Sequence, residues 1–264
     1  MRLVRSVLLS ALGVAHGFSL RTGGVSGGPY ATLNLGEAPD ETFANRAENR
    51  RRFFADAGLD GDLVAEVTQV HGDRVVFARP EAGRVIIAGV PGGQALADPV
   101  EADAIVAAPG VAAAVRVADC VPILLFDPLT GSAAAVHSGW RGTAARVVEK
   151  AVAALENAAG AKPDGLRAAL GPSIRRCCYE VSDELAERFE SDPAFGPATI
   201  DRSTARPRLD LAAANARLLE GAGLRQDHID DLAMCTACEP ARFFSHRRDA
   251  GRTGRHLAAI AAGR

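Results

Sequence analysis

Residues 103–142 read DAIVAAPGVAAAVRVADCVPILLFDPLTGSAAAVHSGWRG. Apolar runs occupy 103–108, 111–118, 121–127 and 131–136, and glycine, proline and aspartate punctuate them. Short apolar runs that are bounded by turn residues and lack polar alternation are typical of fully buried strands. The stretch therefore predicts four closely spaced strands around sharp turns.

The rest of the chain predicts both helices and further strands. We expect a helix over 41–57, with Asp40 as its cap and Gly58 as its stop. Asp210 is the expected cap of a second helix over 211–223. The other expected elements are helices at 143–160 (capped by Thr143), 182–190 and 253–263, and strands at 67–78, 83–89, 166–172 and 231–238. Because strands and helices do not alternate strictly, the pattern favours an α+β fold with a mixed sheet over a doubly wound fold.

The composition limits the possible classes of function. The chain has 264 residues, 48% of them hydrophobic, which is enough for a full core. Its net charge of −2 gives no electrostatic footprint for nucleic acid or an anionic membrane, and no apolar run has the length of a membrane span. Five cysteines, an odd number, argue against a disulfide framework and for a reducing compartment, so we expect a cytoplasmic protein.

The first residues, MRLVRSVLLSALGVA, imitate a signal peptide, because a basic start precedes a short apolar run. No clean small-residue cleavage site follows, however, and HGFSLRTGG continues directly as a structural motif. We therefore expect this segment to be part of the folded domain.

Two histidines and a cysteine form a candidate metal site. His71 and His137 stand beside glycines at the ends of predicted strands, and Cys120 follows another strand. Imidazole and thiolate ligands suit Zn²⁺, and three protein ligands leave a fourth position open, as in catalytic zinc sites. These residues are far apart in the chain, so spacing alone does not justify grouping them.

Six motifs resemble those of a known family, and this resemblance does group the two histidines with the cysteine. The motifs are HGFSLRTGGVSGGPYATLNLG, TQVHGDRV, ADAIVAAPGVAAAVRVADCVPILLFD, AVHSGWRGTA, ALGPSIRRCCYEV and CTACEPARFFSHRRDAGRTGR. Together they resemble the YfiH-like, laccase-domain family, whose members are called polyphenol oxidases, purine nucleoside phosphorylases or peptidoglycan-editing factors. The resemblance implies one compact α+β domain over 1–264, with mixed sheets flanked by helices. It also implies that His71, Cys120 and His137 bind one metal ion and carry the catalysis.

Four arginines are candidates for binding phosphate, because a guanidinium matches phosphate oxygens bidentately. Arg141 stands where the chain turns into the helix that we expect to begin near Thr143, whose free N–H groups also favour an anion. The other candidates are Arg21, Arg247 and Arg248.

The remaining cysteines and histidines receive mostly structural assignments. Cys177, Cys178, Cys235 and Cys238 suggest a four-thiolate zinc site, but adjacent cysteines usually point in different directions, so we expect structural, largely buried thiols. His16 and His246 lie within the family motifs and are candidates for lining the pocket. His228 and His256 are assigned to surface or structural roles.

Three functions compete. The resemblance implies a zinc-dependent purine nucleoside enzyme that uses phosphate to cleave adenosine, inosine or methylthioadenosine and that deaminates adenosine. A copper polyphenol oxidase is the first alternative, although only four histidines remain for the separate cluster that multicopper catalysis needs. A cysteine hydrolase that edits a peptidoglycan precursor, with Cys120 as nucleophile, is the second. The sequence leaves the physiological substrate and the oligomeric state open.

Overall fold

Two packed β-sheets form the centre of the protein in the computed structural model, which describes residues 2–263. The larger sheet has the order β13-β10-β8-β9-β6-β4-β5, comprising Ile229–Asp231, Arg167–Leu170, Val121–Phe126, Ala133–Ser138, Ala104–Ala107, Val75–Glu81 and Arg84–Ala88. It is mixed, because β4 pairs in parallel with β6 and β10 with β13, while the other neighbours are antiparallel.

The smaller sheet has the order β1-β2-β14-β7-β3, comprising Leu3–Val4, His16–Ser19, His256–Ala261, Ala112–Val117 and Val64–Ala65. Its inner face packs on the larger sheet: Val115 and Ile260 share one buried cluster with Ile105 and Leu124. A two-stranded ribbon of β11 (Ile200–Asp201) and β12 (Arg208–Leu209) lies apart from both sheets.

The four strands predicted from 103–136 are confirmed as β6, β7, β8 and β9. Nearly every residue in them is buried, because β6, β8 and β9 lie between a helical layer and the smaller sheet. β7 belongs to the smaller sheet, so these four strands supply both sheets.

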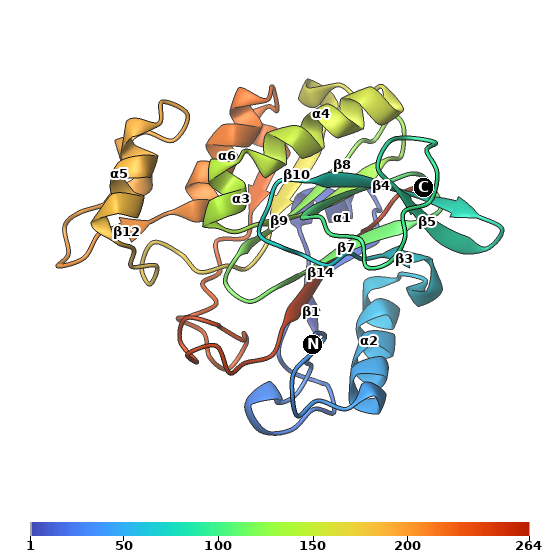
Figure 1. Cartoon of the computed structure of the whole chain (residues 1–264), viewed down its shortest axis with the longest axis horizontal. Coiled ribbons are helices and arrows are strands. Elements are labelled where there is room, and N and C mark those ends of the chain that lie inside the picture. Colours follow the sequence, from blue (N-terminus) through green and yellow to red (C-terminus); the bar gives the residue numbers. More distant parts are fainter. Residues whose placement is uncertain (1, 264) are drawn as a thin grey trace.

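Helices cover the outer faces, as Figure 1 shows. α3 (Trp140–Ala144), α4 (Val147–Ala159) and α6 (Leu211–Gly221) pack over the larger sheet, and α2 (Phe43–Ala57) lies against the smaller one. The remaining helices are α1 (Val7–Ala11), α5 (Asp183–Ser191) and the 3₁₀ turns η1 (Gly28–Tyr30), η2 (Gly61–Leu63), η3 (Pro163–Gly165), η4 (Pro197–Thr199) and η5 (Gln226–His228). The described residues thus form the single α+β domain with mixed sheets and flanking helices that the sequence predicts.

Two of the expected helix caps are wrong. Thr42, not Asp40, caps α2, because its hydroxyl accepts the N–H of Asn45. The helix predicted to start at Thr143 is two helices. Thr143 lies inside α3, and Arg146, whose backbone is in the left-handed region, separates α3 from α4. The stop at Gly58 and the Asp210 cap of α6 are confirmed.

The predictions at the C-terminal end need correction. Residues 253–263 do not form a helix: His256–Ala261 is the strand β14, which pairs with both β2 and β7. Its alanines and leucine favour a helix locally, but five almost fully buried residues (256–260) between two strands override that preference. The strand predicted at 231–238 ends at Asp231, because Ala233 takes a positive φ of 54° and the chain turns.

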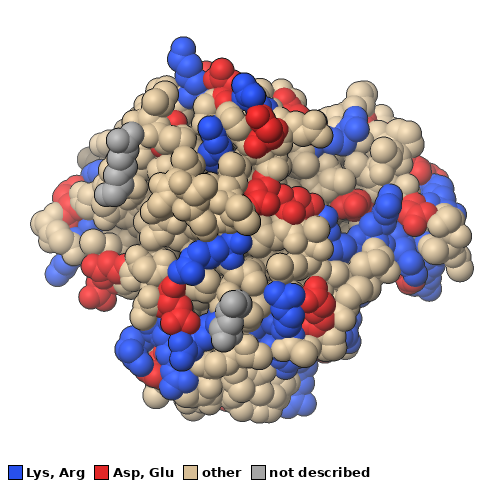
Figure 2. Space-filling view, turned by 180° about the vertical axis from the view of Figure 1, so that it is seen from behind, with Lys and Arg blue, Asp and Glu red and all other residues tan. Residues whose placement is uncertain are grey.

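The N-terminal segment is part of the domain, as expected. β1 pairs with β2, and Leu9 of α1 is fully buried. No helix within residues 2–263 combines the length and apolarity needed to cross a membrane. On the face seen in Figure 2, basic and acidic side chains are intermixed.

Candidate active site

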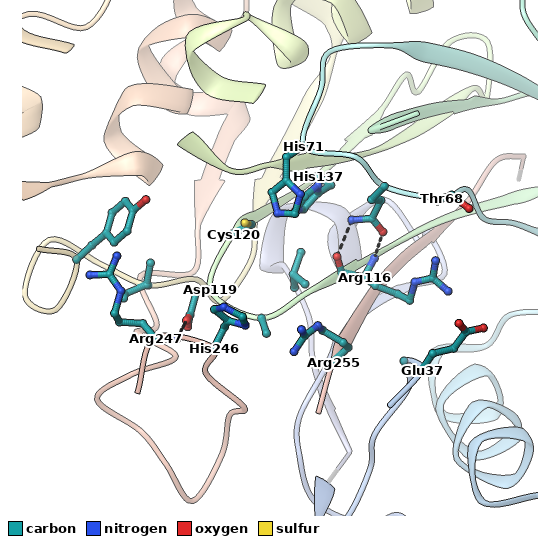
Figure 3. A pocket seen from close by; sticks show the side chains of 16 residues that line it. Glu37, Thr68, His71, Arg116, Asp119, Cys120, His137, His246, Arg247 and Arg255 are labelled. Carbon is teal, nitrogen blue, oxygen red and sulfur yellow. Dashed lines mark hydrogen bonds between the residues drawn. The ribbon is translucent and has the colours of Figure 1, made fainter. Parts of the chain in front are cut away.

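His71, Cys120 and His137 come together at the end of the interior strands β8 and β9 of the larger sheet, as Figure 3 shows. Their ligand atoms all lie within 4.8 Å of one another. Antiparallel pairing of β8 with β9 places Val121 opposite Ser138, which brings the adjacent Cys120 and His137 to the same end of the sheet. The loop before β4 supplies His71.

A buried carboxylate positions both histidines. Asp103, just before β6, accepts a hydrogen bond from Nδ1 of His137 at 2.7 Å. It also accepts the backbone N–H groups of His71 at 3.0 Å and Gly72 at 2.6 Å. These bonds hold 70–72 as a loop in which His71 has a φ of 60°, so the strand predicted at 67–78 starts only at Val75. They also leave Nε2 of His137 for a metal ion.

Charge interactions favour the form of Cys120 that binds metal. Burial alone raises the pKa of Cys120, but hydrogen bonds and charge from His137 and His71 outweigh it and lower the pKa to about 6. Burial alone lowers the pKa of His137, yet Cys120 and Asp103 raise it to about 9. Even without a cation, the pair therefore favours a thiolate beside an imidazolium.

Gly139 leaves room for the sulfur. A Cβ atom at this position would lie 2.9 Å from Sγ of Cys120 and 3.4 Å from Cδ2 of His71. A side chain at this position would therefore push the Cys120 sulfur away and would touch the ring of His71. This explains why a glycine directly follows His137 and Ser138 at the end of β9.

The three residues open into a cavity of about 480 Å³. Its wall includes Tyr179, His246 and the guanidinium groups of Arg116, Arg247 and Arg255. Glu37 and Asp119 also line this cavity, so the three arginines outnumber the carboxylates and favour an anionic ligand.

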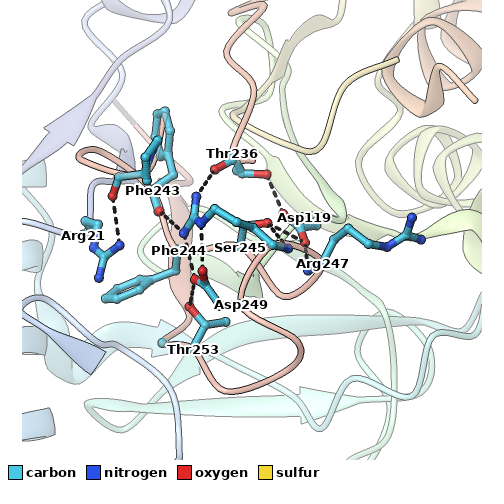
Figure 4. A network of polar contacts seen from close by, with 12 residues as sticks. Arg21, Asp119, Thr236, Phe243, Phe244, Ser245, Arg247, Asp249 and Thr253 are labelled. Carbon is cyan, nitrogen blue, oxygen red and sulfur yellow. Dashed lines mark hydrogen bonds and ion pairs between the residues drawn. The ribbon is translucent and has the colours of Figure 1, made fainter. Parts of the chain in front are cut away.

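Asp119 fixes one side of this cavity, as Figure 4 shows. Its carboxylate accepts hydrogen bonds from the hydroxyls of Thr236 and Ser245 and from the backbone N–H of Arg247. The loop that carries Arg247 is thereby tied to the turn that carries Cys120, although the two are more than a hundred residues apart in the sequence.

Comparisons with known proteins identify the family of this chain. The family model described as Multi-copper polyphenol oxidoreductase laccase matches residues 15–263. The chain belongs to this laccase-domain family. The Purine nucleoside phosphorylase of Deinococcus radiodurans is 42% identical over 251 residues, covering 94% of this chain and 89% of that protein.

Solved structures of similar proteins support the same family membership. YlmD from Geobacillus stearothermophilus matches this laccase-domain protein with a TM-score of 0.85 and 31% identity, over 100% of this chain and 97% of that one. The hypothetical protein YfiH of Bacillus licheniformis matches with a TM-score of 0.82 and 30% identity, over 94% and 92% of the two chains. The resemblance to the YfiH-like family and the fold that it implied are confirmed.

Of the four arginines that the sequence proposed for this laccase-domain protein, one lines the cavity. Arg247 does so and donates to the carbonyl of Glu180. Arg141 lies over the ring of Trp140, 4.3 Å from its centroid. Arg21 donates to the carbonyls of Ala31 and Pro240, and Arg248 to those of Thr236 and Phe243 and to Asp249. Their role in binding phosphate stays a prediction.

Sequence reasoning missed several cavity residues. Arg116 lies within the run that predicted a buried strand, and Arg255 lies just before β14, in the segment predicted as a helix, so neither position suggested a binding residue. His246 lines the cavity as expected, but His16 does not: it is fully buried, where Nε2 accepts the N–H of Ser6 and Nδ1 donates to the carbonyl of Val14.

Proposed function

We propose that this laccase-domain protein is a zinc-dependent purine nucleoside phosphorylase. Its substrates would be adenosine, inosine or methylthioadenosine together with phosphate, and it would also deaminate adenosine. The observation that carries the proposal is the convergence of His71, Cys120 and His137 on a cavity walled by three arginines. Relatives named purine nucleoside phosphorylases support the same reaction class.

The three side chains fit zinc. Two imidazoles and one thiolate are ligands that zinc prefers, and Asp103 orients one of the imidazoles as carboxylates do in many zinc sites. Zinc held by these three residues would supply a Lewis acid, because three protein ligands leave one coordination position free.

The arginines supply the phosphate site in this proposal. Arg247 uses one guanidinium nitrogen on the Glu180 carbonyl, and Arg255 uses one on the carbonyls of Thr253 and Gly254. A guanidinium has five N–H donors, so each keeps donors for the oxygens of an anion. Two fixed guanidinium groups would orient phosphate toward the anomeric carbon of a bound nucleoside, which lowers the entropic part of the barrier.

Apolar side chains on the same wall would hold the purine. Ile174 and Tyr179 line the cavity, and both are nearly buried. Burial and the charge of Cys120 raise the pKa of Tyr179 to about 12, so its phenol stays neutral and able to donate a hydrogen bond. An aromatic ring with one polar donor suits a heterocyclic base.

The alternative functions find less support. Within residues 2–263, potential metal ligands gather in two clusters, the trio and a group of four cysteines, and neither is the separate histidine-rich cluster of a multicopper oxidase. A cysteine hydrolase would use the same trio, with Cys120 as nucleophile, and no additional contact favours it.

The test begins with metal analysis of the purified protein, followed by nucleoside turnover with and without phosphate. We expect zinc, phosphate-dependent release of the purine base, and loss of both activity and the trio's zinc in Cys120→Ser, because a hydroxyl is a poor zinc ligand near neutral pH. Ala237→Ser adds a hydroxyl outside the cavity without removing a candidate metal ligand, and it should keep turnover. Copper in the protein with phenol oxidation far faster than nucleoside cleavage would overturn the proposal, as would metal-independent hydrolysis of a muramoyl peptide.

A further inference from the structure

A second cluster of metal-binding side chains lies outside the cavity. Cys177, Cys178, Cys235 and Cys238 bring their sulfur atoms within 4.8 Å of one another. Cys177 and Cys238 are exposed and Cys178 is partly exposed, so the expectation of largely buried thiols is wrong. All four cysteines are free thiols in this structure.

The spacing of the sulfurs matches a tetrahedral cation site. Sγ of Cys238 lies 3.4 Å from Sγ of Cys177 and 3.3 Å from Sγ of Cys178. Four thiolates around zinc, each about 2.3 Å from the ion, have sulfurs about 3.8 Å apart. A cation would therefore need only small side-chain movements to reach all four ligands.

The backbone explains how the adjacent cysteines converge. Residues 175–178 form a turn in which Cys178 and Tyr179 both donate their N–H groups to the carbonyl of Arg175. This turn lies beside the CTAC turn, because Ser173 forms a β-bridge with Cys235 and accepts the N–H of Thr236. The two cysteine pairs thus face each other from two fixed turns.

We propose that these four cysteines form a structural tetrathiolate zinc site. Four protein ligands close the coordination sphere, which distinguishes this site from the open trio in the cavity. Each thiol that binds releases its proton to solvent. Zinc with four thiolates carries a net charge of −2, and Arg175, held beside the cluster by Asp231, places a positive charge next to it.

The site would stabilise one wall of the cavity. The first turn leads directly into Tyr179, and the second contains Thr236, which donates to Asp119. A zinc ion bridging the two turns would fix both segments relative to Cys120. Its expected role is structural, so its loss should loosen this wall without removing a reacting group.

Metal stoichiometry separates the two sites. In Cys120→Ser, which disables the trio, we expect about one zinc ion per chain to remain. Cobalt substituted into this variant should give the intense visible absorption and sulfur-to-metal charge transfer of a tetrahedral tetrathiolate. In Cys238→Ser, the trio should keep its zinc while the cluster's zinc is lost. The double variant should contain no zinc.

Ala237→Ser is the matched control, because it alters the same CTAC turn without removing a sulfur, and it should keep both zinc ions. If Cys238→Ser proves insoluble, cobalt spectra of Cys120→Ser still decide the question. The proposal is overturned if Cys120→Ser carries no zinc and its cobalt form lacks tetrathiolate bands. It is equally overturned if intact-mass measurement of the freshly purified protein shows these cysteines paired as disulfides. Neither result bears on nucleoside turnover by the trio.

Discussion

Asp103 holds His137 through a 2.7 Å hydrogen bond to Nδ1, and the same carboxylate binds the backbone of His71 and Gly72. Replacing Asp103 by asparagine keeps the shape but weakens the acceptor. We expect zinc affinity of the trio to fall about 10- to 100-fold, because carboxylates that orient metal-binding histidines contribute on this scale.

Chelator competition would measure that affinity. Asp127→Asn is the control, since Asp127 is also fully buried and accepts hydrogen bonds from Thr130, but in the turn between β8 and β9. Unchanged zinc affinity in Asp103→Asn would show that this carboxylate only supports the loop.

Gly139→Ala should damage the trio through space alone. The added Cβ would meet Sγ of Cys120 at 2.9 Å, so the sulfur must move away from the histidines. We expect zinc affinity to drop at least about tenfold, as for other disturbed ligand sets. Gly165→Ala, where the added Cβ meets nothing within 4 Å, is the control. Equal zinc affinities in the two variants would contradict the steric argument.

Arg247→Ala should weaken phosphate binding while leaving zinc in place. Hydrogen bonds to a charged group contribute about 1.5–3 kcal/mol, so the KM for phosphate should rise about 10- to 100-fold. Adenosine deamination, which needs no phosphate, should suffer less. Steady-state kinetics with varied phosphate provides the measurement.

Arg141→Ala tests the residue that the sequence favoured. Because Arg141 stacks on Trp140, we expect a smaller rise in the KM for phosphate than in Arg247→Ala, with zinc content intact. Arg225→Ala, in an exposed ion pair with Asp227, serves as control. Equal losses of phosphorolysis and deamination in Arg141→Ala, or loss of zinc, would show that Arg141 is structural.

His256 should make the fold sensitive to acid. Burial lowers its pKa to about 3, and Nε2 accepts the N–H of Phe244, which requires the neutral ring. The unfolded chain binds more protons between about pH 6.5 and 3, so the contribution of His256 is full above pH 6.5 and falls below it, by up to about 1.4 kcal/mol per pH unit.

Denaturant unfolding of the zinc-free protein at several pH values tests this prediction. His256→Asn should show a shallower loss of stability between pH 6 and 4 than the unchanged chain. His228→Asn, at a half-exposed position beside Arg167, should keep the original slope. Parallel pH profiles for His256→Asn and the unchanged chain would refute the assignment.

Local patterns in the sequence correctly predicted the strands that are buried along their whole length. The runs now seen as β6 to β9 are mostly apolar because both faces are covered, and Asp210 caps α6 through a contact within its own first turn. The identity of the trio came from resemblance, since nothing local connects His71 with Cys120.

Tertiary contacts decided the rest, because they join residues that no short pattern relates. β14 is a strand only because β2 and β7 flank it, against the helical preference of its alanines. In the sequence, Asp103 only marks the start of a predicted strand. Its contact with His137 exists because the fold brings the two residues together. The cysteine pairs at 177–178 and 235–238 converge only because the β-bridge between Ser173 and Cys235 aligns their turns, which overcomes the tendency of adjacent side chains to diverge.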